Sequence, residues 1–277
     1  MDKNFDKNVV AGFGDEWSRF DQSALSAEEL ERIFNEYFNI FPWENLPEDA
    51  VGFDLGCGSG RWAKLVAKRV GHLHLIDPSE AIEVAKRNLT GAENCEFHRA
   101  TVEEIPLPDN SQDFGYSLGV LHHIPDTEKG LQACVDKLKS GAPFLVYLYY
   151  RFDNRPVWYR MIWKTSDVLR RFVSRMPHGL RFGASQILAA AVYFPLARTA
   201  RILEKAGANV KNFPLSQYRN HSYYTMQTDA LDRFGTRLER RFTKDEIKTM
   251  MENCGLRDIK FSEQAFWTAV GFKKQQL

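Results

Sequence analysis

Residues 51–60, Val-Gly-Phe-Asp-Leu-Gly-Cys-Gly-Ser-Gly, decide the fold of this chain. The first five residues predict a short buried strand, and Gly56, Gly58 and Gly60 then predict a tight turn. Apolar residues recur at helical spacing from Trp62 onward. Glycines tolerate positive φ and leave room for a ligand beside the main chain. A helix that follows points free N–H groups at that ligand. The stretch therefore predicts the opening βα unit of a nucleotide-binding fold.

The spacing of the glycines indicates the kind of nucleotide. A dinucleotide site favours Gly-x-Gly-x-x-Gly, whereas here the third glycine comes one residue early and Arg61 fills the expected position. Asp54 stands just before the first glycine and adds negative charge where a diphosphate would lie. It suits a cationic ligand, such as an α-ammonium group. An NAD-dependent dehydrogenase is therefore disfavoured.

The run from Asp54 to Gly60 resembles the Asp/Glu-x-Gly-x-Gly-x-Gly signature of the class I S-adenosylmethionine-dependent methyltransferases. The resemblance extends over residues 50–150 by motif and over 243–272 by the order of the elements. It does not cover residues 151–240. It implies that the chain binds S-adenosylmethionine and releases S-adenosylhomocysteine.

The resemblance also implies where the cofactor makes its contacts. Asp77 ends the next predicted strand and would accept hydrogen bonds from the ribose hydroxyls; its alternative role is a helix N-cap before Pro78. Arg61 would meet the cofactor carboxylate, unless it is a solvated first-turn residue. The predicted cofactor-binding residues are Asp54, Gly56, Gly58, Gly60, Arg61, Asp77, Pro78, Thr101, Val102, Glu103, Leu118 and Gly119.

Predicted strands and helices alternate through the first half of the chain. The strands are expected at 51–55, 72–76, 95–98, 114–118 and 144–150. This alternation predicts an α/β fold with a doubly wound, mostly parallel sheet. Two further strands at 256–262 and 265–272 resemble the reversed final hairpin of the methyltransferase fold. We therefore expect a seven-stranded Rossmann-like methyltransferase sheet with a helical insertion after strand five.

Three regions follow from this pattern. Residues 1–45 form an N-terminal helical arm or cap, 46–150 with 241–277 form the S-adenosylmethionine-binding Rossmann-like domain, and 151–240 form a basic helical insertion. In the arm, the aromatic residues between Gly12 and Phe20 either fold over the cofactor or pack on the domain surface.

Two capping boxes predict helix starts. They are Ser26 with Glu29, in the arm, and Thr243 with Glu246, after the insertion.

The segment after strand four holds two candidate catalytic residues, His122 and His123. It resembles the Val-Leu-His-His segment of small-molecule methyltransferases. Imidazole titrates near neutral pH, so either ring is a candidate general base. The alternative is a structural role in shaping the loop. Methyl transfer from a sulfonium depends mainly on positioning, and it needs a base only when the acceptor must lose a proton.

Composition is that of a soluble globular protein, with 44% hydrophobic and 26% charged residues. The four cysteines lie far apart without a Cys-x-x-Cys pair, which argues against a metal site or a disulfide framework. They favour a reducing, cytoplasmic location. The first residues lack the apolar core of a secretory signal, and no apolar run is expected to reach the roughly 18 residues of a spanning helix.

Charge is uneven along the chain. Residues 151–205 hold 11 Lys/Arg against three acidic residues, a net charge of +8, although the whole chain carries only +1. Arginines 170, 171, 175, 181, 198 and 201 flank the apolar run 187–197. The insertion is therefore a membrane- or lipid-facing surface, a lid over an anionic substrate, or a cap or homodimer surface. Nucleic acid is not expected as a partner, because no recognised binding module accompanies the charge.

Residues 217–226 lead from the insertion back to the main domain and are dense in hydrogen-bonding side chains. Tyr218, Arg219, His221 and Tyr224 are predicted to form a wall of the acceptor site, with packing at an interface as the alternative.

Together these features predict a cytoplasmic methyltransferase that acts on oxygen, nitrogen or carbon of a small biosynthetic metabolite, favouring acidic or sugar-containing acceptors. The nearest alternative is a lipid or quinone acceptor methylated at the membrane surface. A cofactor-binding subunit without catalytic activity is the alternative of another class.

Overall fold

The computed structural model describes residues 3–263 and 267–275. The chain folds as two compact units. The first comprises Met1–Ser23, Leu30–Arg151 and Leu238–Leu277, and the second comprises Ala24–Glu29 and Phe152–Arg237. Most of the predicted N-terminal arm thus belongs to the first unit.

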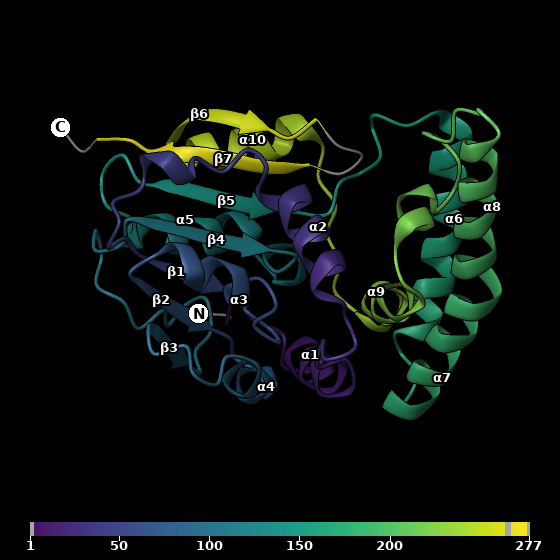
Figure 1. The fold of residues 1–277 in the computed structure, drawn as a ribbon, viewed down its shortest axis with the longest axis horizontal. Coiled ribbons are helices and arrows are strands. Elements are labelled where there is room, and N and C mark those ends of the chain that lie inside the picture. Colours follow the sequence, from purple (N-terminus) through teal and green to yellow (C-terminus); the bar gives the residue numbers. More distant parts are fainter. Residues whose placement is uncertain (1–2, 264–266, 276–277) are drawn as a thin grey trace. The chain divides into compact units, whose positions relative to one another are not determined.

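The first unit is built on one seven-stranded sheet (Figure 1). Its strands are β1 (Val51–Leu55), β2 (His72–Ile76), β3 (Cys95–His98), β4 (Phe114–Leu118), β5 (Pro143–Tyr147), β6 (Leu256–Phe261) and β7 (Thr268–Lys273). They lie in the order β3-β2-β1-β4-β5-β7-β6. The first five are parallel, and β7 runs antiparallel to both neighbours. The predicted doubly wound sheet with a reversed final hairpin is confirmed.

Six α-helices accompany the sheet in the described part of the chain. They are α1 (Lys7–Arg19), α2 (Ala27–Phe38), α3 (Ala63–Val66), α4 (Ala81–Asn88), α5 (Thr127–Lys137) and α10 (Lys244–Asn253). The capping box at Thr243 and Glu246 is complete. At α2 only half of the predicted box forms. The Ser26 hydroxyl accepts the Glu29 N–H, but the Glu29 carboxylate instead accepts from Ser222 and Thr225.

The two faces of the sheet bury different side chains, because alternate residues of a strand point in opposite directions. On one face, Phe53 and Phe144 pack in a cluster that includes α5 and α10 residues such as Leu131. On the other face, Phe38 of α2 packs against Tyr116 of β4, with ring centroids 5.2 Å apart. Asp54 pairs in register with Tyr116, so its carboxyl group is directed to this second, aromatic face.

The second unit is helical. It contains α6 (Val157–Val173), α7 (His178–Leu188), a π-turn at Ala189–Tyr193, α8 (Phe194–Lys205) and α9 (Tyr223–Gly235). The segment from α7 through the π-turn to α8 is one continuous helix, which we call the α7–α8 helix. The small core of the unit consists of Val173, Ala189, Tyr193, Ala197, Met226, Ala230 and Phe234.

Several basic residues of this unit are structural. The buried Arg170 donates to Asp167 at 2.7 Å and to the carbonyl of Thr236 at 2.9 Å, and the buried Arg181 donates to the carbonyl of Gly235 at 3.0 Å. Arg198 donates to two carbonyls of the segment after α8. The sequence grouped these arginines with surface charge, but Arg170, Arg181 and Arg198 are buried or half-buried and bond to backbone carbonyls.

Exposed apolar side chains gather in the second unit. Within the described part of the chain, the large hydrophobic side chains that stand exposed are Val157, Trp158, Met161, Ile162, Val168, Leu169, Phe172, Leu180, Ile187, Val192, Phe194 and Ile202. The α7–α8 helix spans 28 residues and is long and apolar enough to cross a membrane by length and composition, with a mean hydropathy of 1.3 over 18 residues. The prediction that no apolar run reaches this length was therefore wrong.

Candidate functional site

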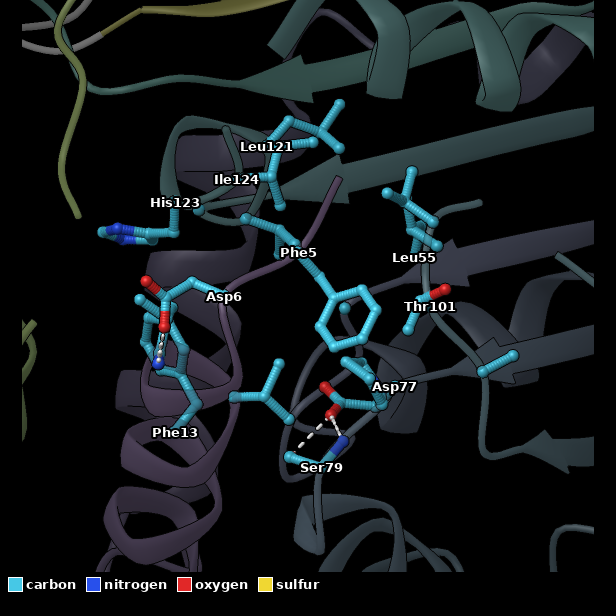
Figure 2. Close-up of a pocket in the computed structure, with 18 of the residues that line it drawn as sticks. Phe5, Asp6, Phe13, Leu55, Asp77, Ser79, Thr101, Leu121, His123 and Ile124 are labelled. Carbon is cyan, nitrogen blue, oxygen red and sulfur yellow. Dashed lines mark hydrogen bonds between the residues drawn. The ribbon is translucent and has the colours of Figure 1, made fainter. Parts of the chain in front are cut away.

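A pocket opens in the first unit at the carboxyl ends of β1, β2 and β4 (Figure 2). It is lined by Phe5, Asp6, Val9, Val10, Phe13, Trp17, Leu55, Gly56, Asp77, Pro78, Ser79, Ala100, Thr101, Val102, Leu118, Gly119, Val120, Leu121, His123 and Ile124. Ligands of doubly wound sheets bind at this edge. Seven of the predicted cofactor residues line the pocket: Gly56, Asp77, Pro78, Thr101, Val102, Leu118 and Gly119.

The glycine turn needs glycine for two reasons. Gly56 and Gly58 have φ of +76° and +53°, where side chains other than glycine are strained. A Cβ on Gly56 would lie 2.3 Å from the side chain of Val120, and one on Gly58 would lie 2.9 Å from the indole nitrogen of Trp17. The main chain is therefore closely covered where it passes the pocket.

Asp77 connects the end of β2 to the glycine turn. Its carboxylate accepts hydrogen bonds from the Gly58 N–H at 2.9 Å, from the Ser79 N–H at 2.9 Å and from the Ser79 hydroxyl at 2.6 Å. Burial raises the pKa of Asp77, and the hydrogen bonds from Ser79 and Gly58 oppose that rise. The N-cap of α4 is Glu80, so the alternative role of Asp77 as a helix N-cap was wrong. Oδ1 accepts two of these bonds and Oδ2 accepts one, so Oδ2 keeps a lone pair for a further donor.

Asp54 lies below the glycine turn and is only 2% exposed. Its Oδ2 has no hydrogen-bond partner among the described residues. Burial raises the pKa of Asp54 to about 8; the Tyr116 hydroxyl and Arg61 oppose this rise, and the charge of Asp77 adds to it. At neutral pH the carboxyl is therefore mostly protonated. A cation bound beside it would favour the ionised form.

Helix α1 covers the pocket from the N-terminal side. Val9, Phe13 and Trp17 recur every fourth residue and line it together. Figure 2 shows the ring of Phe5 lying beside Asp77 and Thr101. The preceding Asn4 is buried, and its side-chain amide both donates to the Asp126 carbonyl at 2.9 Å and accepts the Asp126 N–H at 2.7 Å. The arm therefore contributes one wall of the pocket.

Sequence reasoning identified the aromatic cluster of the arm but missed Phe5, Val9 and Val10. The four-residue spacing of Val9, Phe13 and Trp17 predicts a common helix face. Two glycines within the same stretch lower its helix propensity, which hid this pattern.

Two predicted cofactor residues have other partners. The Arg61 guanidinium stacks over the rings of Trp17 and Trp62, at 5.3 and 4.3 Å from their centroids. The Glu103 carboxylate accepts from Lys129 at 2.7 Å and does not line the pocket. Arg61 thus packs between the arm and the first turn after the glycines, and a role of Arg61 or Glu103 in cofactor binding stays a prediction.

The two histidines differ in position. His123 lines the pocket, and its Nδ1 donates to the Leu238 carbonyl at 2.7 Å, which leaves Nε2 as the basic nitrogen. His122 is fully buried and stacks on Tyr149 with ring centroids 3.8 Å apart. Burial and the neighbouring His123 lower the pKa of His122 well below its usual value. His122 therefore stays neutral and shapes the loop.

The predicted acceptor residues all lie in the second unit. The ring of Tyr218 packs 5.3 Å from that of Tyr193, Arg219 pairs with Glu204 at 2.8 Å, and His221 lies 3.5 Å from the Glu29 carboxylate. Tyr224 lies in the first turn of α9. None of the four lines the pocket described above. Their role in acceptor binding stays a prediction.

Comparison with known proteins identifies the first unit. The family model described as "Methyltransferase domain" matches residues 53–146, which contain the glycine turn, Asp77 and the histidine segment. The chain carries a class I methyltransferase domain. The cofactor of such domains is S-adenosylmethionine.

Relatives extend the similarity over part of the chain. A ubiquinone biosynthesis O-methyltransferase of Marinobacter nauticus is 28% identical over 149 residues, which cover 52% of this chain and 63% of that protein. A demethylmenaquinone methyltransferase of Listeria monocytogenes is 28% identical over 183 residues, covering 61% of this chain and 72% of that protein. Human N-acetylserotonin methyltransferase, solved with S-adenosylmethionine, shares the fold with a TM-score of 0.55 at 17% identity over 95% of this chain and 57% of that one.

The pocket of this chain fits S-adenosylmethionine on its own evidence. Asp54 is buried and does not line the pocket itself, and its unpartnered Oδ2 suits an ammonium group; the lone pair left on Oδ2 of Asp77, in the lining, suits a ribose hydroxyl. The hydroxyl of Thr101 is buried in the lining without a partner among the described residues, so it has a hydrogen bond to offer a ligand.

Proposed function

We propose that the protein is an S-adenosylmethionine-dependent methyltransferase that acts on a small biosynthetic metabolite. The observation that supports this most directly is that Gly56 and Asp77 line one pocket, with the Gly58 N–H bonded to Asp77 and the buried Asp54 close by on β1. Asp54 offers a carboxyl group to the ammonium cation of the cofactor. The glycine turn lets a ligand lie close to the main chain, and Asp77 offers a carboxylate oxygen to the ribose.

The bound cofactor supplies an activated methyl group on a sulfonium. The residues of this chain then have three tasks. Asp54 and Asp77 hold the two polar ends of the cofactor, so that the methyl group meets the acceptor in line. The apolar side chains of Phe5, Val9 and Phe13 exclude water from the pocket. His123, through Nε2, accepts a proton from acceptors that must lose one.

The acceptor site belongs to the same proposal. Our candidates for contacting the acceptor remain Tyr218, Arg219, His221 and Tyr224, through polar and aromatic side chains. Acidic or sugar-containing acceptors were expected because of the arginines in the insertion. Arg170 and Arg181 are buried and already bonded to Asp167 and to the Gly235 carbonyl, so these two arginines do not support an acidic acceptor.

A quinone or other lipid acceptor is the second candidate. It is supported by the relatives, whose names concern ubiquinone and demethylmenaquinone. It is also supported by the exposed apolar side chains of the second unit, which suit a lipid environment. In either case we place the reaction in the cytoplasm or at its membrane face, where the four free cysteines remain reduced.

A non-catalytic cofactor-binding subunit is the alternative of another class. The test that separates it is methyl transfer from labelled S-adenosylmethionine into an extract, sorted afterwards into aqueous and organic-soluble products. We expect label in one fraction with wild type and with Asp109→Ala, which removes an exposed carboxylate paired with Lys137. We expect none with Asp77→Ala. Cofactor binding without transfer into either fraction would contradict catalysis and favour the subunit.

A further inference from the structure

Helix α6 presents an apolar stripe to solvent. At 100° per residue, Val157, Val168, Met161, Phe172, Trp158, Leu169 and Ile162 fall in that order within an arc of about 140°. All seven side chains are exposed, by 42% to 68%. A soluble helix normally turns such a stripe inward.

The opposite side of α6 carries the contacts with the rest of the second unit. Asp167 and Arg170 are buried there, and Val173 is buried next to the edge of the stripe at Ile162. Arg170 is fastened to the Thr236 carbonyl, and Ser174, the residue after the helix, accepts through its carbonyl from Arg237. The apolar stripe is therefore the outer surface of a helix whose inner face is already occupied.

Basic side chains border this stripe. Arg160, Arg171 and Lys164 are exposed and fall within about 60° of one edge of it on the helical wheel. Arg171 pairs with Asp167 at 2.9 Å. An apolar face with Lys and Arg along its border, and with Trp158 on it, is the pattern of helices that lie in a membrane interface.

The α7–α8 helix adds a second apolar surface. Leu180, Ile187, Phe194 and Ile202 are exposed by 40% to 68% and recur about every second turn. Only 28% of the most apolar 18-residue window is buried, so this helix is not a core helix. Its inner side is held by Arg181 on Gly235 and by the packing of Ala189 and Ala197 on α9.

We propose that α6 and the α7–α8 helix dock this protein on an anionic lipid bilayer, with α6 lying in the plane of the interface. The basic residues beside the stripe favour a lipid bilayer, and not a second copy of the chain, as the partner of this surface. Stripes that faced each other across a two-fold axis would bring Arg160, Lys164 and Arg171 of both copies to one interface, where like charges repel. An anionic surface attracts all of them.

The docking proposal goes beyond the methyltransferase activity and holds whether the acceptor is a lipid or not. Hydrogen bonds within the second unit favour docking in the plane of the membrane over a membrane-spanning α7–α8 helix. A spanning α7–α8 helix would have to release Arg181 and Arg198 from their carbonyl partners into hydrocarbon, at high cost.

Vesicle flotation with the full chain tests the proposal. The vesicles contain phosphatidylcholine alone or with phosphatidylglycerol, at low and at high salt. We expect binding to the anionic vesicles, with weakening at high salt. Arg160→Glu with Lys164→Glu should weaken it about tenfold or more. The matched control, Lys64→Glu with Lys68→Glu, reverses two exposed charges of the first unit and should change it less than about twofold.

A second variant distinguishes loss of vesicle binding from loss of folding. Met161→Gln with Phe172→Gln removes apolar area from two exposed positions, so its melting curve should match wild type while its vesicle binding falls. Failure of folded wild type to bind anionic vesicles at low salt would overturn the proposal. Equal binding by the Arg160/Lys164 variant would do the same, as would resistance to alkaline extraction or a dimer in solution that the Met161/Phe172 variant abolishes.

Discussion

Cofactor binding should release a proton from Asp54. In the free protein the pKa of this buried carboxyl is about 8, so below that pH it is mostly protonated. The α-ammonium group of the cofactor carries charge at pH 6 to 7, because an α-amino group titrates near 7.7 to 8.0. Placing that cation near Asp54 favours the carboxylate, and the proton leaves to solvent.

The size of the effect follows from the pKa. At pH 6.5 nearly the whole population of Asp54 is protonated, so about one proton should be released per ligand bound. Between pH 6 and pH 7 the dissociation constant should therefore fall about tenfold, which is about 1.4 kcal/mol.

Titration calorimetry with S-adenosylhomocysteine measures both quantities without turnover. Heats recorded in buffers of different ionisation enthalpy give the number of protons released, and the pH series gives the dissociation constants. Asp54→Asn is the matched variant, because it keeps the shape of the protonated side chain and cannot ionise. It should bind without the proton release and with little change of affinity from pH 6 to 7.

A flat pH series in wild type would refute this reasoning. So would proton release that persists in Asp54→Asn, because the proton would then come from another group. Either result would mean that Asp54 stays protonated in the complex and supports the turn without meeting a cation.

Four further predictions follow from the same contacts. Without ligand, Asp54 binds more protons in the folded than in the unfolded protein, so its contribution to stability falls as pH rises from about 4 to 8, by up to about 1.4 kcal/mol per pH unit. Thermal melts should show that Asp54→Asn loses less stability than wild type over this pH range. Parallel curves for the two proteins would contradict the prediction. Gly56→Ala should abolish S-adenosylhomocysteine binding in calorimetry, because its Cβ would meet Val120 at 2.3 Å in a left-handed conformation; near-normal affinity would be the contrary result. Asn4→Ala removes two hydrogen bonds to Asp126, at about 1 to 3 kcal/mol, so hydrogen exchange of residues 5–10 should speed up, whereas unchanged protection would show that the arm is held elsewhere. His123→Gln should lower methyl transfer about 100-fold with acceptors that lose a proton, with unchanged cofactor affinity; an equal loss with an acceptor that keeps its protons would assign His123 to positioning.

The sheet could be predicted from sequence because its determinants are local. Phe53 and Leu55 alternate with small or polar residues, and the glycines mark the end of β1 with a spacing that few other folds use. For the same reason, the pocket residues that follow β2 and β4 could be predicted from the sequence. Their strands end at the same edge of a parallel sheet, which brings Asp77 and Gly119 together without further information.

The rest depends on contacts between distant residues. Glu29 completes a capping box by sequence, yet its carboxylate bonds to Ser222, 193 positions away. Arg170 and Arg181 were grouped with surface charge because nothing local reveals that they bond to the carbonyls of Thr236 and Gly235. A buried arginine and a solvated one have the same neighbours in sequence.

The α7–α8 helix illustrates a third reason why a feature could not be predicted from the sequence. Pro195 lies inside the apolar run 187–197, and a proline usually ends or kinks a helix. In the structure Pro195 is the second residue of α8 within the continuous helix, and the π-turn directly before it carries the helix onward from α7 past the missing N–H. A π-turn leaves no clear mark in the sequence, so the continuous helix of 28 residues was missed.

The central claim is that the glycine turn and Asp77 bind an S-adenosyl cofactor. The most direct test is ligand-induced thermal stabilisation of wild type, Asp77→Ala and Asp109→Ala by S-adenosylhomocysteine and, in parallel, by NAD. A ligand at about 100 times its dissociation constant adds roughly 2.7 kcal/mol to the free energy of unfolding. We expect that shift with S-adenosylhomocysteine in wild type and in Asp109→Ala, a much smaller one in Asp77→Ala, and none with NAD. Stabilisation by NAD alone, or an equal response of Asp77→Ala, would contradict the assignment of this pocket.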